Sequence, residues 1–211
     1  MQMPPTVFLI DDDDTFYQTL VRLVSSVGLR TERQASGKTF LQTFDCNHPG
    51  CVLIDLGKPH LEGMHVLESL APIPLRPPVI GLVDQADVKV VVRAARQGAA
   101  ALLQPRHTSH TELLEAIQAA VAQDQQQRAN FARGEAIRGR FDLLNASEWQ
   151  VLELLLHGHD LTYIADKLAV SRRTVDNRRL RLMQKLQVTT FAGLVALLIE
   201  KGHFPDPAAG Q

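Results

Sequence analysis

Hydrophobic residues in the first half of the chain alternate between short continuous runs and stretches with helical spacing. Buried strands are predicted by the apolar runs at 6–10, 51–55, 77–83 and 100–103, with a weaker strand at 30–33. Helices are predicted by apolar residues three and four positions apart, at 15–28, 36–44, 64–70, 86–98 and 111–123. Because strands and helices alternate, the pattern predicts a parallel sheet with right-handed crossovers and helices on both faces.

The pattern changes after about residue 121. Residues 122–140 are polar, rich in Gln and Arg and free of Pro, so they either continue the preceding helix or form a flexible linker. Only helical patterns follow from 141 to 204. The Pro-, Ala- and Gly-rich residues 205–211 indicate a frayed tail. We therefore predict a first domain over 1–121, a connector over 122–140 for which we favour a helix, and an all-α domain over 141–204.

Composition limits the function classes. The 211 residues carry a formal net charge of -1, so any contact with nucleic acid must come from a local basic patch. No apolar run approaches the roughly 18–20 residues of a membrane helix, and the start of the chain lacks a basic signal-peptide head. Cys46 and Cys51 form neither a zinc-like nor a CxxC pattern, which suits a reducing compartment. We expect a cytoplasmic protein.

Carboxylates gather where two of the predicted strands end. Asp11 and Asp12 follow the strand at 6–10, and Asp55 ends the strand at 51–55. In a parallel sheet these ends meet at one edge, where sites form. Carboxylates brought close together raise one another's pKa or need a cation, and oxygen ligands with open positions suit Mg²⁺. The next two acids, Asp13 and Asp14, have a simpler explanation, because either can cap the helix that follows.

The N-terminal half resembles a response-regulator receiver domain over about 120 residues. The resemblance lies in the acid pair Asp11 and Asp12, the acceptor Asp55, and Pro59 four residues later. It implies an α/β flavodoxin-like fold, with five parallel strands in the order 2-1-3-4-5 and Asp55 as the phosphorylated residue. It also implies a Mg²⁺ site made by Asp12, Asp55 and the carbonyl of Gly57, with Asp11 acting through water.

Two groups that the family uses to sense phosphate are missing. The Thr or Ser that ends the fourth strand is replaced by Val83, and the Lys that ends the fifth is replaced by Gln104 or Pro105. The aromatic residue that reports phosphorylation is replaced by Leu102 or Leu103. Because a hydrogen bond to a charged group contributes about 1.5–3 kcal/mol, these losses weaken the response to phosphate. We expect an atypical receiver that binds Mg²⁺ weakly or not at all and is held in one dimerisation state.

Three cationic or titratable residues near this corner leave alternatives open. Arg106 or His107 is the nearest candidate to replace the missing Lys, and Lys58 stands where the family usually has Met. Lys58 either reaches into the pocket or is solvated, and we favour the solvated side chain. The alternative control is that of a conventional phosphorelay regulator, in which a histidine kinase phosphorylates Asp55.

The C-terminal half contains three successive helical stretches, at 145–158, 160–170 and 171–186. In the first, Trp149 and the Leu residues are predicted to be core. Ser171 is expected to cap the last helix, which should bury Val175, Leu182 and Leu186 at positions i, i+7 and i+11. Six basic residues and one acid lie between Arg172 and Lys185. Because a helix–turn–helix precedes this basic face, binding to DNA is favoured over a merely solvated surface.

This half resembles the LuxR/FixJ/NarL-type DNA-binding domain over about 60 residues, in the segments 147–158, 164–188 and 189–202. The resemblance implies that the helix from Thr174 to Lys185 enters the major groove of double-stranded DNA. Asn pairs with adenine and Arg with guanine, so base contacts are expected from Asp176, Asn177 and Arg181. Phosphate contacts are expected from Arg172, Arg173, Arg178 and Lys185, and Thr174 shares the outward stripe. The final helix, 191–201, either pairs two domains on DNA or packs within its own domain.

Taken together, the sequence predicts a bacterial-type transcription regulator that binds a two-half-site operator as a homodimer. A nucleotide-binding enzyme is disfavoured, because the first strand leads into four aspartates and not into a Gly-rich phosphate loop. A module that docks a partner protein or a small ligand remains a third possibility, since Val83 and Gln104 make the corner less selective for charge.

Overall fold

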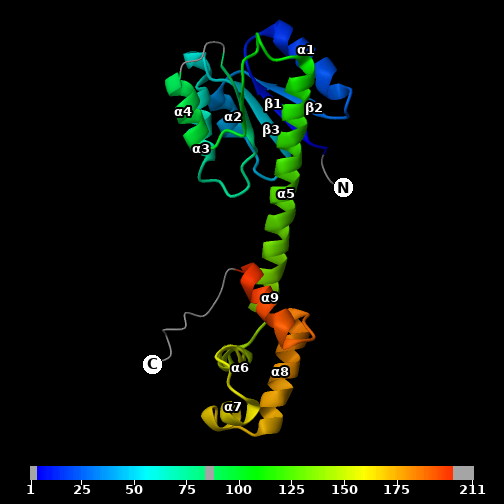
Figure 1. The fold of residues 1–211 in the computed structure, drawn as a ribbon, viewed down its shortest axis with the longest axis vertical. Coiled ribbons are helices and arrows are strands. Elements are labelled where there is room, and N and C mark those ends of the chain that lie inside the picture. The colour runs from blue at the N-terminus through cyan, green and yellow to red at the C-terminus, as the bar shows by residue number, and fades with distance from the viewer. Residues whose placement is uncertain (1–3, 84–87, 202–211) are drawn as a thin grey trace. The chain divides into compact units, whose positions relative to one another are not determined.

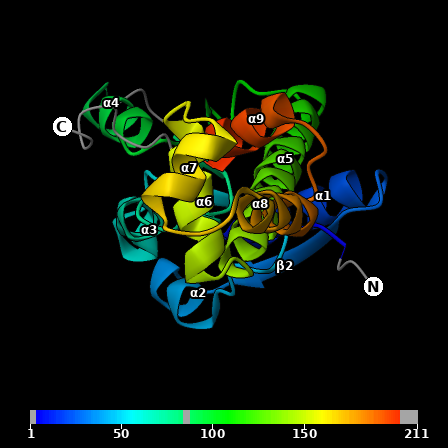
Figure 2. The same cartoon turned by 90° about the horizontal axis from the view of Figure 1, so that it is seen from below.

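The structure is a computed structural model that describes residues 4–83 and 88–201, with the side chains of 200 and 201 left aside. It divides into two compact units between Ala129 and Asn130. The first residues of the predicted 86–98 helix and the expected tail at 205–211 lie outside the described residues. Figures 1 and 2 show the elements of each unit.

The first unit is built on a five-stranded parallel sheet of order β2-β1-β3-β4-β5, which confirms the predicted fold. Its strands are β1 (Thr6–Ile10), β2 (Arg30–Gln34), β3 (Gly50–Asp55), β4 (Val79–Leu82) and β5 (Ala101–Leu103). The helices between and after them are α1 (Asp14–Ser25), α2 (Gly37–Thr43), α3 (Gly63–Leu70), α4 (Val88–Arg96) and α5 (His110–Asp142). A short 3₁₀ helix, η1 (Pro59–Leu61), precedes α3.

Alternate residues of the strands face two helical layers, because side chains of a strand point to opposite faces in turn. Phe8 and Ile10 of β1 pack in a buried cluster with α2, α3 and α4. Val7 and Leu9 of the same strand pack in a second buried cluster with α1 and α5. Figure 1 shows α2, α3 and α4 on one side of the sheet and α5 on the other. Because both faces are covered, β1, β3 and β4 are mostly buried and apolar, which is why continuous runs marked them in the sequence. The edge strand β2 is polar and partly exposed.

Helix α5 continues through the segment predicted to be a connector, so residues 122–140 are helical. Leu113 and Ile117 are buried in the first unit, and Ile137 and Phe141 are buried in the second. Between them, the buried carboxylate of Asp124 accepts a hydrogen bond from the Gly50 N–H at 2.9 Å and one from Arg128 Nε at 2.8 Å. The bond from Gly50 attaches α5 to the start of β3, and the bond from Arg128 is made within α5.

The second unit contains α6 (Ala146–Leu156), α7 (Leu161–Lys167), α8 (Arg172–Leu186) and α9 (Phe191–Lys201). Val175, Leu182 and Leu186 of α8 are fully buried, as predicted from their spacing. Trp149 is not a core residue as predicted: it is 38% exposed and stacks on Phe141 with ring centroids 5.9 Å apart. It lies at the edge of the helical core and covers the buried Phe141.

A test for membrane-spanning length and hydropathy, applied to the described residues, finds no single helix that passes. The bent pair formed by α8 and the segment Phe191–Ile199 of α9 passes only when the two are taken together, with a bend of 49°.

Candidate functional site

The structure brings the three predicted acids together at the carboxyl edge of the sheet. Ile10 pairs with Ile54 in the β1–β3 ladder, so Asp11 and Asp55 follow at the same level. The side chain of Asp11 is 6% exposed and that of Asp55 is 13% exposed, whereas that of Asp12 is 53% exposed. Asp55 Oδ1 accepts the Gly57 N–H at 2.7 Å. Asp13, one of the two predicted caps, accepts the N–H groups of the first turn of α1.

Lys58 lies inside this acidic corner, contrary to the solvated side chain that we favoured. Its ammonium donates to Asp11 Oδ1 at 2.7 Å and to Asp12 Oδ1 at 2.6 Å. It is also 3.6 Å from Asp55 Oδ2. One ammonium therefore reaches all three carboxylates, because it sits where their oxygens converge.

Two further cationic or titratable residues border the corner, and the sequence reasoning did not single them out. His60 Nε2 is 2.9 Å from Asp12 Oδ2, and Arg33 Nε donates to the Asp11 carbonyl at 3.0 Å. Arg33 also pairs with Asp14. No local sequence signal links these residues to the acids, because they come from β2 and η1.

The pKa values follow from these contacts. Hydrogen bonds from Lys58 and then from His60 hold the pKa of Asp12 well below its usual range. Burial raises the pKa of Asp55, against the opposing Gly57 N–H and the charge of Lys58. Burial acts to lower the pKa of Lys58, but hydrogen bonds to Asp11 and Asp12 outweigh it and raise the pKa above its ordinary value. Lys58 is therefore charged at neutral pH.

The residues that stand in for the missing phosphate sensors lie next to each other. Leu82 pairs with Leu103 at the ends of β4 and β5, and Val83 and Gln104 follow them directly. Val83 is buried, its N–H donates to the Leu103 carbonyl at 2.9 Å, and its side chain offers no hydrogen-bond donor. Val83 and Gln104 both line a shallow pocket against α4.

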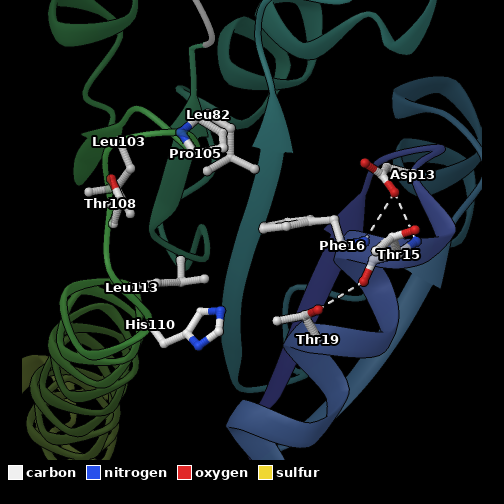
Figure 3. Close-up of a pocket in the computed structure, with 10 residues that line it drawn as sticks. All are labelled: Asp13, Thr15, Phe16, Thr19, Leu82, Leu103, Pro105, Thr108, His110 and Leu113. Carbon is white, nitrogen blue, oxygen red and sulfur yellow. Dashed lines mark hydrogen bonds between the residues drawn. The ribbon is translucent and has the colours of Figure 1, made fainter.

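A separate pocket of about 270 Å³ lies between α1 and the start of α5. Phe16 and Thr19 line it from α1, and Pro105, His110 and Leu113 line it from the opposite side (Figure 3). Neither Asp11 nor Asp55 lines this pocket. It is mainly apolar and distinct from the acidic corner.

The second candidate site is the outward face of α8. Ser171 caps the helix, as predicted, by accepting the Thr174 N–H at 3.1 Å. Arg172, Arg173, Asn177 and Arg181 are exposed, and Thr174, Asp176 and Arg178 are partly exposed. Figure 2 shows α8 end-on beside α6 and α7, which cover its buried side.

Two of the predicted DNA-contacting residues are engaged within the domain. Asp176 Oδ1 accepts from Arg179 Nη2 at 2.9 Å. Lys185 donates to the buried Glu148 at 2.6 Å and to the Leu143 carbonyl at 3.0 Å. A contact between Lys185 and DNA stays a prediction, and the structure gives this residue a role in holding α8 to α6.

Glu148 is a structural residue that the sequence reasoning did not single out. It completes a capping box, in which its carboxylate accepts the Asn145 N–H at 3.0 Å and Asn145 accepts the Glu148 N–H at 2.9 Å. An Asn followed three residues later by Glu is a known signature of a helix start. The sequence therefore contained this signal.

The final helix, α9, packs within its own domain, and its pairing of two domains on DNA stays a prediction. Leu194, Leu197 and Leu198 pack inside the domain. Phe191 and Ile199 are 50% and 59% exposed, on a separate stripe. The helix therefore has an inner face that the domain uses and an outer apolar face.

Two family models match the chain, one in each half. The model of the response regulator receiver domain matches residues 7–118, and that of the luxR family of bacterial regulatory proteins matches residues 142–198. The chain is a response regulator of the LuxR family. Several similar proteins are named as transcriptional regulatory proteins.

Similar proteins match this response regulator over nearly its whole length. TodT, a response regulator protein of Pseudomonas putida, is 30% identical over 90% of this chain and 83% of its own. The transcriptional regulatory protein FixJ of Azorhizobium caulinodans is 30% identical over 94% of both chains. The solved structure of the response regulator StyR is 30% identical over 94% of this chain and all of its own, with a TM-score of 0.85.

Proposed function

We propose that this response regulator controls transcription by binding double-stranded DNA as a homodimer, without phosphorylation of Asp55 in the usual way. DNA binding is supported by one observation: helix α8 has a buried apolar face and an opposite face of exposed Arg and Asn. A helix with this surface, preceded by a short helix and a turn, fits the major groove.

The side chains on α8 divide into two roles by their chemistry. Asn177 and Arg181 contact base edges in the major groove, since an Asn amide hydrogen-bonds adenine and an Arg guanidinium hydrogen-bonds guanine. Arg172, Arg173 and Arg178 contact phosphates, which positions the protein without specifying sequence. Asp176 orients Arg179, with which it forms an ion pair. Thr174 supports the start of the helix through its contact with Ser171 at 2.8 Å.

The exposed apolar stripe of α9 is the dimer contact of the DNA-binding domain. Phe191, Val195 and Ile199 are spaced four residues apart, so they share one face of the helix. Phe191 and Ile199 are at least half exposed. Pairing two copies through this face links two weak half-site contacts into one stronger contact. The regulator is expected to act in the cytoplasm and to have no catalytic activity of its own.

The receiver is proposed to be degenerate because its corner lacks the groups that bind a phosphoryl group. Val83 has no hydroxyl and Gln104 has no charge, so a phosphoryl group on Asp55 would lose two favourable partners. The alternative is a conventional phosphorelay regulator phosphorylated at Asp55 by a histidine kinase. The acid pair, Asp55 and Pro59 favour that alternative, because they retain the receiver motif.

Beryllofluoride, a phosphoryl mimic, distinguishes a degenerate receiver from a conventional phosphorelay regulator. The full chain is incubated with MgCl₂ with and without beryllofluoride, and dimerisation is followed by analytical ultracentrifugation. DNA affinity is measured in parallel by fluorescence anisotropy, on a duplex that the protein selects from a random pool. We expect both quantities to stay within about twofold, because no hydroxyl or Lys of β4 or β5 is there to bind the mimic.

Asp55→Ala is the control for this experiment, because it removes the acceptor carboxylate. A large gain in dimerisation or DNA affinity with beryllofluoride, present in the wild type and absent in Asp55→Ala, would establish the conventional phosphorelay form instead.

A further inference from the structure

The acidic corner brings three carboxylates together, and their mutual repulsion is unfavourable unless a cation lies among them. Asp11 and Asp55 are mostly buried, and Asp12 lies beside them. Like charges this close raise one another's pKa or require a cation among them. The cation in this structure is Lys58 of the chain itself.

Lys58 is positioned for this role by the backbone around it. Pro59 follows it directly, and a residue before Pro is restricted to extended backbone; Lys58 has φ -100° and ψ 105°. The loop then returns against β3 at Gly63, where an added Cβ would lie 2.8 Å from the Asp55 carbonyl oxygen. The Lys58 side chain is therefore directed at the acids from a constrained loop, and only 33% of it is exposed.

The donor set of the corner does not fit Mg²⁺ as it is arranged. Mg²⁺ requires near-octahedral oxygen ligands at about 2.0–2.1 Å. Here Asp11 Oδ1 and Asp12 Oδ1 accept from the Lys58 ammonium, and Asp55 Oδ1 accepts from the Gly57 N–H. Among the described residues, no group of three or more His, Cys, Asp or Glu side chains is arranged to hold a metal ion. A divalent cation entering the corner would meet the Lys58 charge at contact distance.

We propose that Lys58 is the resident cation of the acidic corner and competes with Mg²⁺ for the same carboxylates. This role of Lys58 rests on the proposed function, because Lys58 would be the residue that keeps the receiver from binding metal and phosphate. His60, which contacts Asp12, supports the same arrangement from the exposed side.

The test compares Mg²⁺ binding by the full chain with Lys58 and without it. MgCl₂ is titrated by isothermal calorimetry into wild type, Lys58→Met and Lys58→Gln, each freed of metal with EDTA and exchanged into buffer. Both variants should bind Mg²⁺ at least about tenfold more tightly than the wild type, which corresponds to about 1.4 kcal/mol. Adding Asp12→Asn to Lys58→Met should abolish the gain, because it removes one of the ligands.

Thermal unfolding in EDTA and in MgCl₂ gives a second readout. Both Lys58 variants should unfold at a lower temperature than the wild type in EDTA, since three carboxylates then lack their counterion. MgCl₂ should restore the variants and leave the wild type unchanged. Lys38→Met, the same chemical change at an exposed site on α2, should behave as the wild type in both solutions.

Equal Mg²⁺ affinities of the wild type and a folded Lys58 variant would overturn the proposal. So would tighter binding by the wild type. Either result would leave the DNA-binding function standing, because that function depends on α8 and not on the acidic corner. A beryllofluoride response in the wild type would overturn the proposed control independently of how the Lys58 variants bind Mg²⁺.

Discussion

Replacing Arg178 and Arg181 together by Gln is expected to weaken DNA binding by about 30- to 1,000-fold, or about 2–4 kcal/mol. Arg181 is exposed on the face of α8 that lies opposite its buried residues, and Arg178 is partly exposed beside it. Removing the phosphate-contacting charge should also lower the slope of log K against log salt by about one per contact. Fluorescence anisotropy on a selected duplex, repeated at several salt concentrations, measures both effects.

A matched control removes the same charge from the receiver domain, outside the helical domain that contains α8. Arg22→Gln with Lys38→Gln changes two exposed basic residues on α1 and α2 of the receiver. This double variant should bind DNA within about twofold of the wild type at moderate salt, since it leaves every residue on the proposed DNA-contacting face of α8 unchanged. Equal losses in the two double variants would show that net charge, and not the face of α8, drives binding.

Replacing Glu148 by Ala is expected to destabilise the DNA-binding domain by about 2–4 kcal/mol. The Glu148 side chain is 3% exposed, completes the cap of α6 and pairs with Lys185 of α8. Its loss leaves the Asn145 N–H without this acceptor and the Lys185 ammonium without its buried partner. Urea unfolding followed by Trp149 fluorescence reports on this domain. Glu153→Ala, at an exposed position of the same helix, should change stability by less than about 0.5 kcal/mol.

The contribution of Glu148 also has a defined pH dependence. Burial opposes its ionisation, but hydrogen bonds from Lys185 and the Asn145 N–H hold the pKa of Glu148 below the ordinary value of 4.5. A lowered pKa in the folded state means that the stabilisation is present above pH 4.5 and is lost as the pH falls below it. The difference between wild type and Glu148→Ala should therefore shrink between pH 7 and pH 3, and a constant difference would assign the effect to packing.

The fold followed from the sequence because its signals were local and repeated. The apolar runs of β1 and β3, each ending in carboxylates, marked the strands and their common edge. Spacing alone identified the buried residues of α8. Trp149 was placed wrongly, because hydrophobic identity does not say how much of a large ring a small helical domain can cover.

The candidate site was only partly predictable. The acids were found from strand ends, but the position of Lys58 depends on where a loop side chain comes to rest. Lys58 is three residues from Asp55 in sequence and 46 and 47 from its main partners, Asp12 and Asp11. Pattern and spacing do not encode a contact across that separation. The same holds for Lys185. Its pairing with Glu148 on α6 could not be predicted from the pattern of basic residues along α8.

Phosphoryl transfer from a small-molecule donor tests the central claim most directly. The full chain and Asp55→Asn are incubated with acetyl phosphate and MgCl₂, and intact mass and DNA affinity are measured on the same samples. We expect no phosphoryl group on the wild type beyond that on Asp55→Asn, and equal DNA affinity with and without the donor. Incorporation that is lost in Asp55→Asn and that tightens DNA binding would contradict the account.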